Sequence, residues 1–334
     1  MKSIQQVEPW YEPSDLLREK MEFECEMNRE DHGFLCGMIK AVRPAKIVEI
    51  GVAEGGTTSV IMNCLAMLNM ASSVYSVDLN QHFYQDISLK TGYEYEKLKE
   101  FAKGKSKHEF LFGKTIAGQI DIIGKNIDMV IIDTTHSLPG EILDFLAIFP
   151  FLSQGAFVLL HDINLNYSRS FAVNKVVASK AAECVATKIL LMTVTADKYI
   201  NCNDIYMGNI GTFQINQDTN KYICSLFFAL TMTWSYQMRE DIEEEYRTIY
   251  ERYYDKECLK WFDLAVYNNK RIVSRQRIRS FLYEKIPKGS NIILYAAGNS
   301  GKRIYAMVEG DKHCNIIGWV DKNYNKYMKK RVTC

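Results

Sequence analysis

Short apolar runs alternate with helical segments along the first two thirds of the chain, and this alternation limits the fold more than any other feature. Buried strands are expected at 46–50, 73–77, 128–132 and 156–160, with a further short strand at 109–112. Strands that alternate with helices form parallel sheets with helices on both faces. The sequence therefore predicts an α/β fold built on a doubly wound sheet.

Helical patterns fill the spaces between these strands. Apolar residues at helical spacing predict helices at 13–43, 57–70 and 139–151. The first of these ends at Pro44, and the last has proline in its first turn, where the missing N–H is tolerated. Two later apolar runs, 188–194 and 211–215, are expected to complete the sheet as strands.

The composition changes near residue 218, which divides the chain into three parts. Residues 1–218 are expected to hold the large sheet and its N-terminal helices, and 219–286, which is rich in charges and tyrosines, a helical linker. Residues 287–334 read as a partial second βαβ module, with strands at 291–296 and 315–320. Because only one βαβ unit precedes Cys334, truncation of the chain is one explanation for its small size.

The C-terminal module carries a second glycine turn, whose role stays open. Ala296 stands where a dinucleotide-binding turn has its first glycine, and Gly298 and Gly301 follow. Asp321 lies 20 residues after Gly301, a spacing at which an acid can meet a ribose. Nucleotide or nucleotide-sugar binding competes here with a purely structural or docking role.

Charge and cysteine content exclude several classes of protein. The formal net charge of the 334 residues is +1, so no overall field favours nucleic acid or an anionic membrane. The nine cysteines are scattered without a CxxC pair, which suits a reducing compartment. The polar N-terminus does not resemble a signal peptide, and no segment is long and apolar enough for a membrane span. The expected location is cytoplasmic.

A glycine-rich turn follows the first predicted strand. The strand 46–50 runs directly into Gly51-Val52-Ala53-Glu54-Gly55-Gly56, and a helix opens at Thr57. Glycine allows a sharp turn and close approach of the backbone to a ligand, and ligands bind at the carboxyl ends of strands in open α/β sheets. An isolated turn of this kind is also found without a ligand.

Asp78 strengthens the case for a ligand. It ends the second strand, 27 residues beyond Gly51. A carboxylate at this position can accept hydrogen bonds from both hydroxyls of a ribose. The alternative is an ordinary cap at the start of a helix.

The run Val48–Thr58 resembles motif I of class I S-adenosylmethionine (SAM)-dependent methyltransferases. It is most similar to the branch with small-molecule and sugar O-methyltransferases and cephalosporin hydroxylase-like proteins. Glu49 precedes the first glycine by two positions, as in that family, whereas Ala53 replaces the family's middle glycine. The resemblance covers about residues 30–215 and implies a Rossmann-like methyltransferase sheet. It implies a SAM site at Glu49, Gly51, Val52, Ala53, Gly55, Thr57, Asp78, Lys114, Thr115 and Asp133.

Acids and histidines follow two further strands. Asp133 and His136 come after the strand 128–132, and His161 and Asp162 come after 156–160. Because parallel strands end at one edge of a sheet, we expect these four side chains to converge near the cofactor, although such residues also form caps and turns. Carboxylates are suitable ligands for Mg²⁺. A bound cation lowers the pKa of an acceptor hydroxyl, and a neutral histidine can take up the proton that this hydroxyl releases.

The pattern Asp-x-x-His followed by His-Asp resembles the metal-dependent members of that O-methyltransferase branch. The resemblance implies that Asp133 and Asp162 bind Mg²⁺ and that His136 is the base. His161 departs from members that have a second acid at its position, which leaves its part open. Three roles stay open for His161: a third ligand of Mg²⁺, a contact to the substrate, or a ligand of a softer metal such as Mn²⁺.

Together these features predict a SAM-dependent O-methyltransferase that is assisted by a divalent metal. The expected acceptor is a hydroxyl of a sugar, nucleotide sugar or related small molecule, in polysaccharide or natural-product biosynthesis. The alternatives are an NAD-dependent oxidoreductase or epimerase of nucleotide sugars and a non-catalytic nucleotide-binding protein. Glu49 argues against the former, because NAD-binding folds usually lack this acid. A homodimer is left open.

Overall fold

The computed structural model describes residues 5–21, 25–166, 184–201, 208–232, 234, 236–295 and 298–321. The chain forms two compact units, Met1–Asn269 and Lys270–Cys334. Each unit is described by itself below. The boundaries predicted at 218/219 and 286/287 remain a prediction.

An eight-stranded sheet forms the centre of the first unit, in the order β1-β7-β8-β6-β5-β2-β3-β4. β8 is antiparallel to both of its neighbours, β6 and β7, whereas all other neighbouring strands are parallel. The predicted α/β fold is confirmed. The strands are β1 (Gln5–Val7), β2 (Lys46–Ile50), β3 (Ser73–Asp78), β4 (Lys107–Phe112), β5 (Ile127–Ile132), β6 (Leu152–His161), β7 (Asp197–Asn201) and β8 (Ile210–Gln214).

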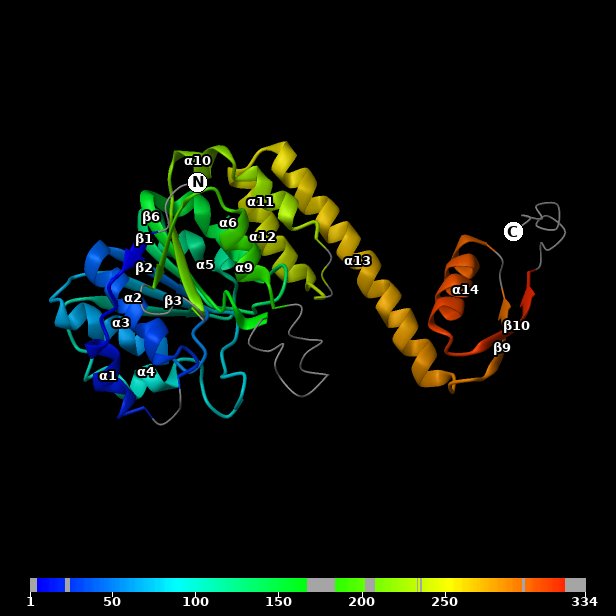
Figure 1. Ribbon diagram of the computed structural model, residues 1–334, viewed down its shortest axis with the longest axis horizontal. Coiled ribbons are helices and arrows are strands. Elements are labelled where there is room, and N and C mark those ends of the chain that lie inside the picture. Colours follow the sequence, from blue (N-terminus) through cyan, green and yellow to red (C-terminus); the bar gives the residue numbers. More distant parts are fainter. Residues whose placement is uncertain are drawn as a thin grey trace. The chain divides into compact units, whose positions relative to one another are not determined.

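Helices cover both faces of this sheet (Figure 1). One face carries α1 (Glu12–Arg18), α2 (Arg29–Val42), α3 (Gly56–Met67) and α4 (Tyr93–Leu98). The other carries α5 (Ile116–Ile123), α6 (Gly140–Ile148), α9 (Ala186–Thr193), α11 (Cys224–Ala229), α12 (Glu240–Tyr253) and the first turns of α13 (Lys256–Lys285). The short η1 (Phe149–Phe151) follows α6, and α10 (Gln217–Lys221) follows β8.

The apolar runs of the strands supply both halves of the core. In β5, Met129 and Ile131 pack on the α2–α3 face, whereas Val130 and Ile132 pack on the α5–α6 face. Successive side chains of a strand point to opposite faces, so a strand buried on both faces is apolar throughout. Each such side chain stabilises the fold by about 1.5–3 kcal/mol.

The helix predicted over 13–43 is two helices, so that prediction is wrong in its continuity. α1 ends at Arg18, and α2 begins only at Arg29. Asn28 starts α2 because its side chain accepts the backbone N–H of Asp31 at 2.9 Å. α2 ends at Val42. The next residue, Arg43, has a left-handed φ of 51° and is followed by Pro44.

The prediction of a strand at 188–194 is also wrong, because these residues form most of α9. Ala186 and Leu190 are buried one helical turn apart, on the face that packs against α6. The sheet is completed instead by β7 and β1, neither of which was predicted. The strand predicted at 211–215 is confirmed as β8.

The second unit contains a small βαβ element. β9 (Asn291–Tyr295) and β10 (Asn315–Val320) pair in parallel, and α14 (Asn299–Asp311) connects them. The rings of Tyr305 and Trp319 stack at a centroid distance of 5.0 Å. Of the predicted glycine turn, Gly298 precedes α14, whereas Ala296 and Ala297 lie outside the described residues.

Among the described residues, no helix combines the length and hydrophobicity that crossing a membrane requires.

Candidate functional site

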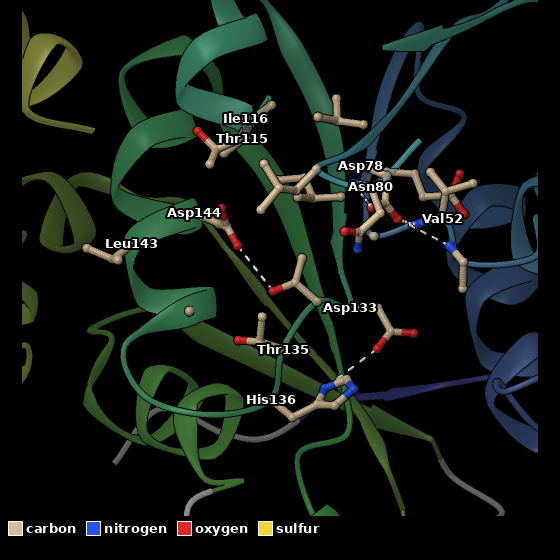
Figure 2. Close-up of a pocket in the computed structure, with 18 of the residues that line it drawn as sticks. Val52, Asp78, Asn80, Thr115, Ile116, Asp133, Thr135, His136, Leu143 and Asp144 are labelled. Atoms are coloured by element: carbon tan, nitrogen blue, oxygen red, sulfur yellow. Dashed lines mark hydrogen bonds and ion pairs between the residues drawn. The ribbon is translucent and has the colours of Figure 1, made fainter. Parts of the chain in front are cut away.

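A cavity of about 500 Å³ lies where β2, β3 and β5 end, as Figure 2 shows. Ten of the predicted site residues line it: Glu49, Gly51, Val52, Ala53, Thr57, Asp78, Lys114, Thr115, Asp133 and His136. Gly55, His161 and Asp162 are not among the lining residues. The chain therefore places the glycine turn and part of the acid–imidazole group around one space.

Gly51 is the tightest point of the glycine turn. Its φ is +93°, and a Cβ atom here would lie 1.8 Å from the carbonyl oxygen of Asp133. Backbone hydrogen bonds hold this approach: Gly51 N–H donates to Val77 and Asp133 N–H donates to Ile50, both at 2.9 Å. Only glycine fits this contact between the ends of β2 and β5.

Ala53, the departure from the family pattern, also has a left-handed backbone, with a φ of 48°. Gly55, in the same turn, has a φ of +93° and precedes the first residue of α3. A non-glycine residue at positive φ is strained by about 1–2 kcal/mol. The turn thus keeps a glycine-like conformation at Ala53 although it lacks the glycine.

Asp78 holds the glycine turn from the neighbouring strand. Its Oδ2 accepts the backbone N–H groups of Val52 at 2.9 Å and Ala53 at 3.3 Å, and its Oδ1 accepts Asn80 N–H at 2.8 Å. Figure 2 shows this carboxylate facing the turn. The alternative of a helix cap is wrong, because the next helix, α4, begins only at Tyr93.

Glu49 offers an acceptor at the edge of the cavity. Its Oε2 accepts hydrogen bonds from the hydroxyls of Thr58 and Ser76, each at 2.6 Å. Its Oε1 is buried and has no hydrogen-bond partner among the described residues. Burial raises the pKa of Glu49 to about 7. A cation in the cavity could use this free oxygen and would favour the charged carboxylate.

Lys114 and Thr115 form the part of the cavity wall that follows β4. Both the N–H and the hydroxyl of Thr115 donate to Glu245 of α12, at 3.0 and 2.6 Å. Thr115 also caps α5 by accepting Gly118 N–H at 3.4 Å. The two hydrogen bonds to Glu245 fix the end of β4 against α12.

The predicted acids and histidines lie together at the carboxyl edge of the sheet. His136 Nε2 lies 3.2 Å from Asp162 Oδ2, and its Nδ1 lies 3.8 Å from Asp133 Oδ1. One donor atom from each of these three residues lies within 4.8 Å of the others, a spacing compatible with a metal ion. His161 adjoins the same carboxylates, with Nδ1 3.1 Å from Asp133 Oδ2 and 3.7 Å from Asp162 Oδ1.

The backbone is strained at two members of this cluster. His136 has a φ of 60° and Asp162 a φ of 59°. Non-glycine residues in the left-handed region cost of order 1–3 kcal/mol and gather at functional sites. The loop of His136 is held by Glu141, whose Oε1 accepts the backbone N–H of His136 at 2.5 Å.

The electrostatics of the cluster call for positive charge. Burial alone lowers the pKa of His161, but Asp133, Asp31 and Asp162 outweigh it and raise that pKa well above its ordinary value. Burial raises the pKa of Asp133, but His161 and His136 more than reverse this and lower it. Either a proton on His161 or a divalent cation can supply the charge that these carboxylates need.

Several cavity residues were not predicted. Leu143 and Asp144 come from α6, Ile242 and Tyr246 from α12, and Tyr236 from the segment before α12. Asp144 Oδ1 accepts the hydroxyl of Tyr246 at 2.6 Å. The sequence did contain a signal, because Ile242, Tyr246 and Tyr250 recur at four-residue spacing, which indicates a buried helical face.

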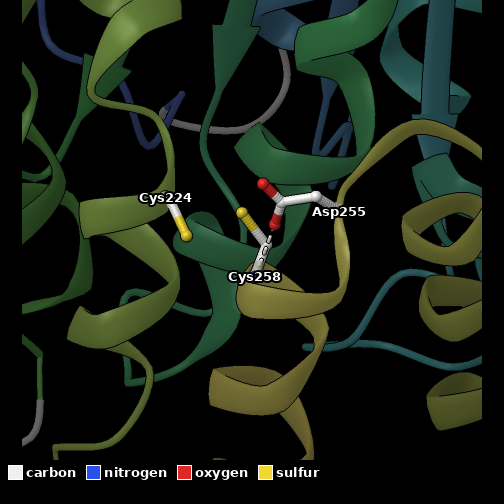
Figure 3. Close-up of side chains that lie close together, drawn as sticks. All are labelled: Cys224, Asp255 and Cys258. Carbon is white, nitrogen blue, oxygen red and sulfur yellow. Dashed lines mark hydrogen bonds between the residues drawn. The ribbon is translucent and has the colours of Figure 1, made fainter.

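A second group of possible ligands, Cys224, Asp255 and Cys258, lies away from the cavity lining (Figure 3). Asp255 Oδ1 accepts the backbone N–H groups of Glu257 at 3.0 Å and Cys258 at 2.9 Å, which caps the start of α13. Cys258 is buried in the core, and burial raises the pKa of its thiol. Helix capping and core packing account for this group.

Residues 48–163 match the family model described as a methyltransferase domain. The matched segment starts within β2, contains the glycine turn, Asp78 and Asp133, and ends just after Asp162. This part of the chain thus resembles a methyltransferase domain. The match supports the prediction of a methyltransferase.

Solved structures similar to this chain include a putative caffeoyl-CoA O-methyltransferase from Staphylococcus aureus, at 14% identity and a TM-score of 0.44, covering 61% of this chain and 91% of that one. An S-adenosylhomocysteine-bound methyltransferase from Podospora anserina has 12% identity and a TM-score of 0.44, covering 62% and 87%. The O-methyltransferase TomG from Streptomyces achromogenes, solved with SAM, has 13% identity and a TM-score of 0.41, covering 64% and 92%. A search of curated proteins finds no match.

Proposed function

We propose that this methyltransferase transfers the methyl group of SAM to a hydroxyl of a sugar, nucleotide sugar or related small molecule, with the help of a divalent cation. One observation carries the proposal: Asp133 lines the cavity beside the glycine turn and also belongs to the acid–imidazole cluster. A cofactor in that cavity and an acceptor at the cluster would be neighbours. The sugar-like acceptor and the biosynthetic pathway rest on the sequence resemblance.

The cofactor would be held by the residues of the glycine turn and its neighbours. SAM supplies the electrophilic methyl group. The backbone of Gly51–Ala53 and the free Oε1 of Glu49 suit its methionine part, which carries an ammonium and a sulfonium. Asp78 suits a ribose hydroxyl, because its Oδ1 accepts only the N–H of Asn80 and keeps a lone pair, whereas its Oδ2 already accepts two N–H groups of the turn. Lys114 and Thr115 would lie on the adenine side.

The cation would be held by Asp133 and Asp162, with His161 as the third protein ligand. Mg²⁺ or Mn²⁺ held by these residues would make the acceptor hydroxyl more acidic. The donor set fits a cation in two respects. The carboxylates of Asp133 and Asp162 lie close together. Nδ1 of His161 lies 3.1 and 3.7 Å from them and has no hydrogen-bond partner in the described part of the chain.

His136 is the proposed base. Its side chain lines the cavity and is 17% exposed, so an acceptor can reach it. Taking the proton of the acceptor hydroxyl leaves an imidazolium, which Asp162 at 3.2 Å and Glu141 at 3.6 Å would stabilise.

Calorimetry with SAM, S-adenosylhomocysteine and NAD tests the cofactor. We expect both sulfur compounds to bind and NAD not to bind. Replacing Asp78 with alanine should strongly weaken the binding of S-adenosylhomocysteine. The glycine turn then loses the carboxylate that accepts its N–H groups, and the ribose loses its hydrogen-bond acceptor. Tighter binding of NAD than of S-adenosylhomocysteine would contradict the proposal and favour an oxidoreductase.

Two variants test the roles within the cluster, with methyl transfer measured on a panel of nucleotide sugars, simple sugars and a catechol. D133N should lose Mn²⁺ binding and turnover. H136Q should slow turnover about 10²- to 10⁴-fold, the usual contribution of a general base, and keep its affinity for S-adenosylhomocysteine. H82Q, which changes an exposed histidine outside the cavity lining, is the control. Unchanged turnover in H136Q would exclude it as the base.

A further inference from the structure

Asp31 is a buried acid that the reaction proposed above does not use. It lies in the first turn of α2, is 1% exposed, and places Oδ2 3.2 Å from Nε2 of His161, 130 residues away in sequence. We propose that Asp31 is a positioning residue that fixes the ring of His161 for metal binding and thereby sets which metal the site prefers. This inference rests on the proposed function of the cluster.

The surrounding structure holds Asp31 firmly in this place. Its own N–H donates to Asn28, the cap of α2, at 2.9 Å, so its backbone belongs to a defined helix start. His161 is the last residue of β6 and is 3% exposed. A carboxylate and an imidazole at such depth are stable only when they pair, because burial of an unpaired charge is costly.

The contact determines which nitrogen of His161 faces the cluster. An ionised carboxylate only accepts hydrogen bonds, so Nε2 must carry the hydrogen that lies toward Asp31. Nδ1 is on the other side of the ring, 3.1 Å from Asp133 Oδ2 and 3.7 Å from Asp162 Oδ1. Nδ1 makes no well-aligned hydrogen bond within the described residues. The ring therefore presents Nδ1 to the two carboxylates.

A carboxylate behind a histidine has a recognised effect on a metal site. It fixes the orientation of the ring and makes the outward nitrogen a better donor, and loss of such a partner typically weakens metal affinity about 10- to 100-fold. Imidazole suits transition metals better than it suits Mg²⁺, which prefers oxygen donors. Asp31 and His161 together should thus favour Mn²⁺ over Mg²⁺.

A purely structural role makes a different prediction. If the pair only ties α2 to the sheet, losing Asp31 lowers stability but leaves the ratio of Mn²⁺ to Mg²⁺ affinity unchanged. The decisive quantity is therefore that ratio, together with its dependence on His161. Activity alone would not separate the two roles.

The experiment measures Mn²⁺ binding to the full chain by electron paramagnetic resonance, with Mg²⁺ as the competitor. D31N should bind Mn²⁺ about 10- to 100-fold more weakly and lose preference for it over Mg²⁺. D15N is the matched control, since Asp15 is an exposed acid of α1 that pairs with Arg29. In an H161Q background, D31N should add no further loss, because Asp31 acts through His161.

Three results would overturn the proposal. An unchanged affinity ratio in D31N would leave Asp31 a structural role only, and equal losses from D31N with and without H161Q would show that it does not act through His161. If the unmodified chain binds no Mn²⁺, the metal part of the proposed function fails first, which the wild-type titration reveals by itself.

A second measurement needs no variant and so does not depend on D31N folding. Nitrogen-15 resonances of the imidazole in the Mg²⁺-loaded full chain should show hydrogen on Nε2 of His161 and none on Nδ1. Hydrogen on Nδ1 would overturn the proposal.

Discussion

At the scale of single residues, Gly51 carries the strictest requirement in the cavity. The missing side chain leaves room for the carbonyl oxygen of Asp133, which would lie 1.8 Å from a Cβ atom. That oxygen belongs to backbone at the end of β5 and is held by the sheet. The position therefore has neither the space nor the backbone conformation for another amino acid.

We expect G51A to be more damaging than a glycine substitution that adds only backbone strain. G124A is the control, because Gly124 also has a positive φ, of 69°, but nothing lies within 4 Å of its added Cβ. G124A should cost about 1–3 kcal/mol, and G51A a further 1–3 kcal/mol or so from the steric overlap. Urea unfolding of both variants measures the difference, and equal costs would contradict the steric argument.

The two kinds of site residue differ in how far the sequence alone could predict them. Glu49, Gly51 and Asp78 lie in or near one turn, so local spacing and the family resemblance were enough to find them. Asp31 and Asp144 gave no such signal. Each meets its hydrogen-bond partner only when a helix packs in the folded chain. Asp31 and His161 are 130 residues apart in sequence, so no local pattern can indicate their contact.

At the scale of elements, α12 joins the cavity through a buried pair of side chains. Tyr246 donates its hydroxyl to Asp144 Oδ1 at 2.6 Å, and Thr134 donates to the other oxygen at 3.2 Å. Burial raises the pKa of Asp144 to about 7, against an ordinary value of 3.8. The carboxyl group that connects α6 with α12 thus keeps its proton to a higher pH in the folded chain than in the unfolded chain.

This pKa predicts how stability depends on pH. Because the folded chain keeps a proton that the unfolded chain releases above about pH 4, the contribution of Asp144 to the unfolding free energy falls between about pH 4 and 7. D144N stays neutral, so its stability should fall less across that window. Urea unfolding at about pH 5 and about pH 7.5 tests this. D121N, at an exposed carboxylate of α5, should keep the wild-type slope; an identical slope in D144N would contradict the assignment.

The elements that the sequence predicted correctly are those whose apolar pattern is typical of one kind of secondary structure. β2, β3, β5 and β6 are apolar runs bounded by turn residues, and they were placed to within a few residues. The run 188–194 is apolar almost throughout, which suits a strand and a buried helix equally, and packing against α6 decided for the helix. β7 was missed because Asp197–Asn201 is mostly half-buried and carries little apolar signal.

At the scale of the whole molecule, all residues that line the cavity belong to the first unit. The second unit has its own small sheet of β9 and β10, with α14 between them. A ligand stabilises the structure that binds it, by about 2.7 kcal/mol at a free concentration 100 times its Kd. Binding at the cavity should therefore be visible in one unit and not in the other.

Hydrogen exchange of the full chain, with and without saturating S-adenosylhomocysteine, checks this expectation. Slower exchange is expected around 49–56, 78–80 and 242–246, where backbone borders the cavity. Exchange in 291–295 and 299–320 should stay the same. Protection that appears instead at the start of α14 would indicate that the second unit binds the nucleoside, as a dinucleotide-binding module would.

The contact between Gly51 and the backbone of Asp133 has a consequence for redesigning the enzyme. It joins the glycine turn, the proposed cofactor site, to the loop that carries Asp133 and His136, so one backbone junction sets the position of both parts. A search for altered acceptor scope should spare both strand ends. It should vary α6 and α12 instead, where Leu143, Ile242 and Tyr246 offer side chains that can be exchanged without touching that junction.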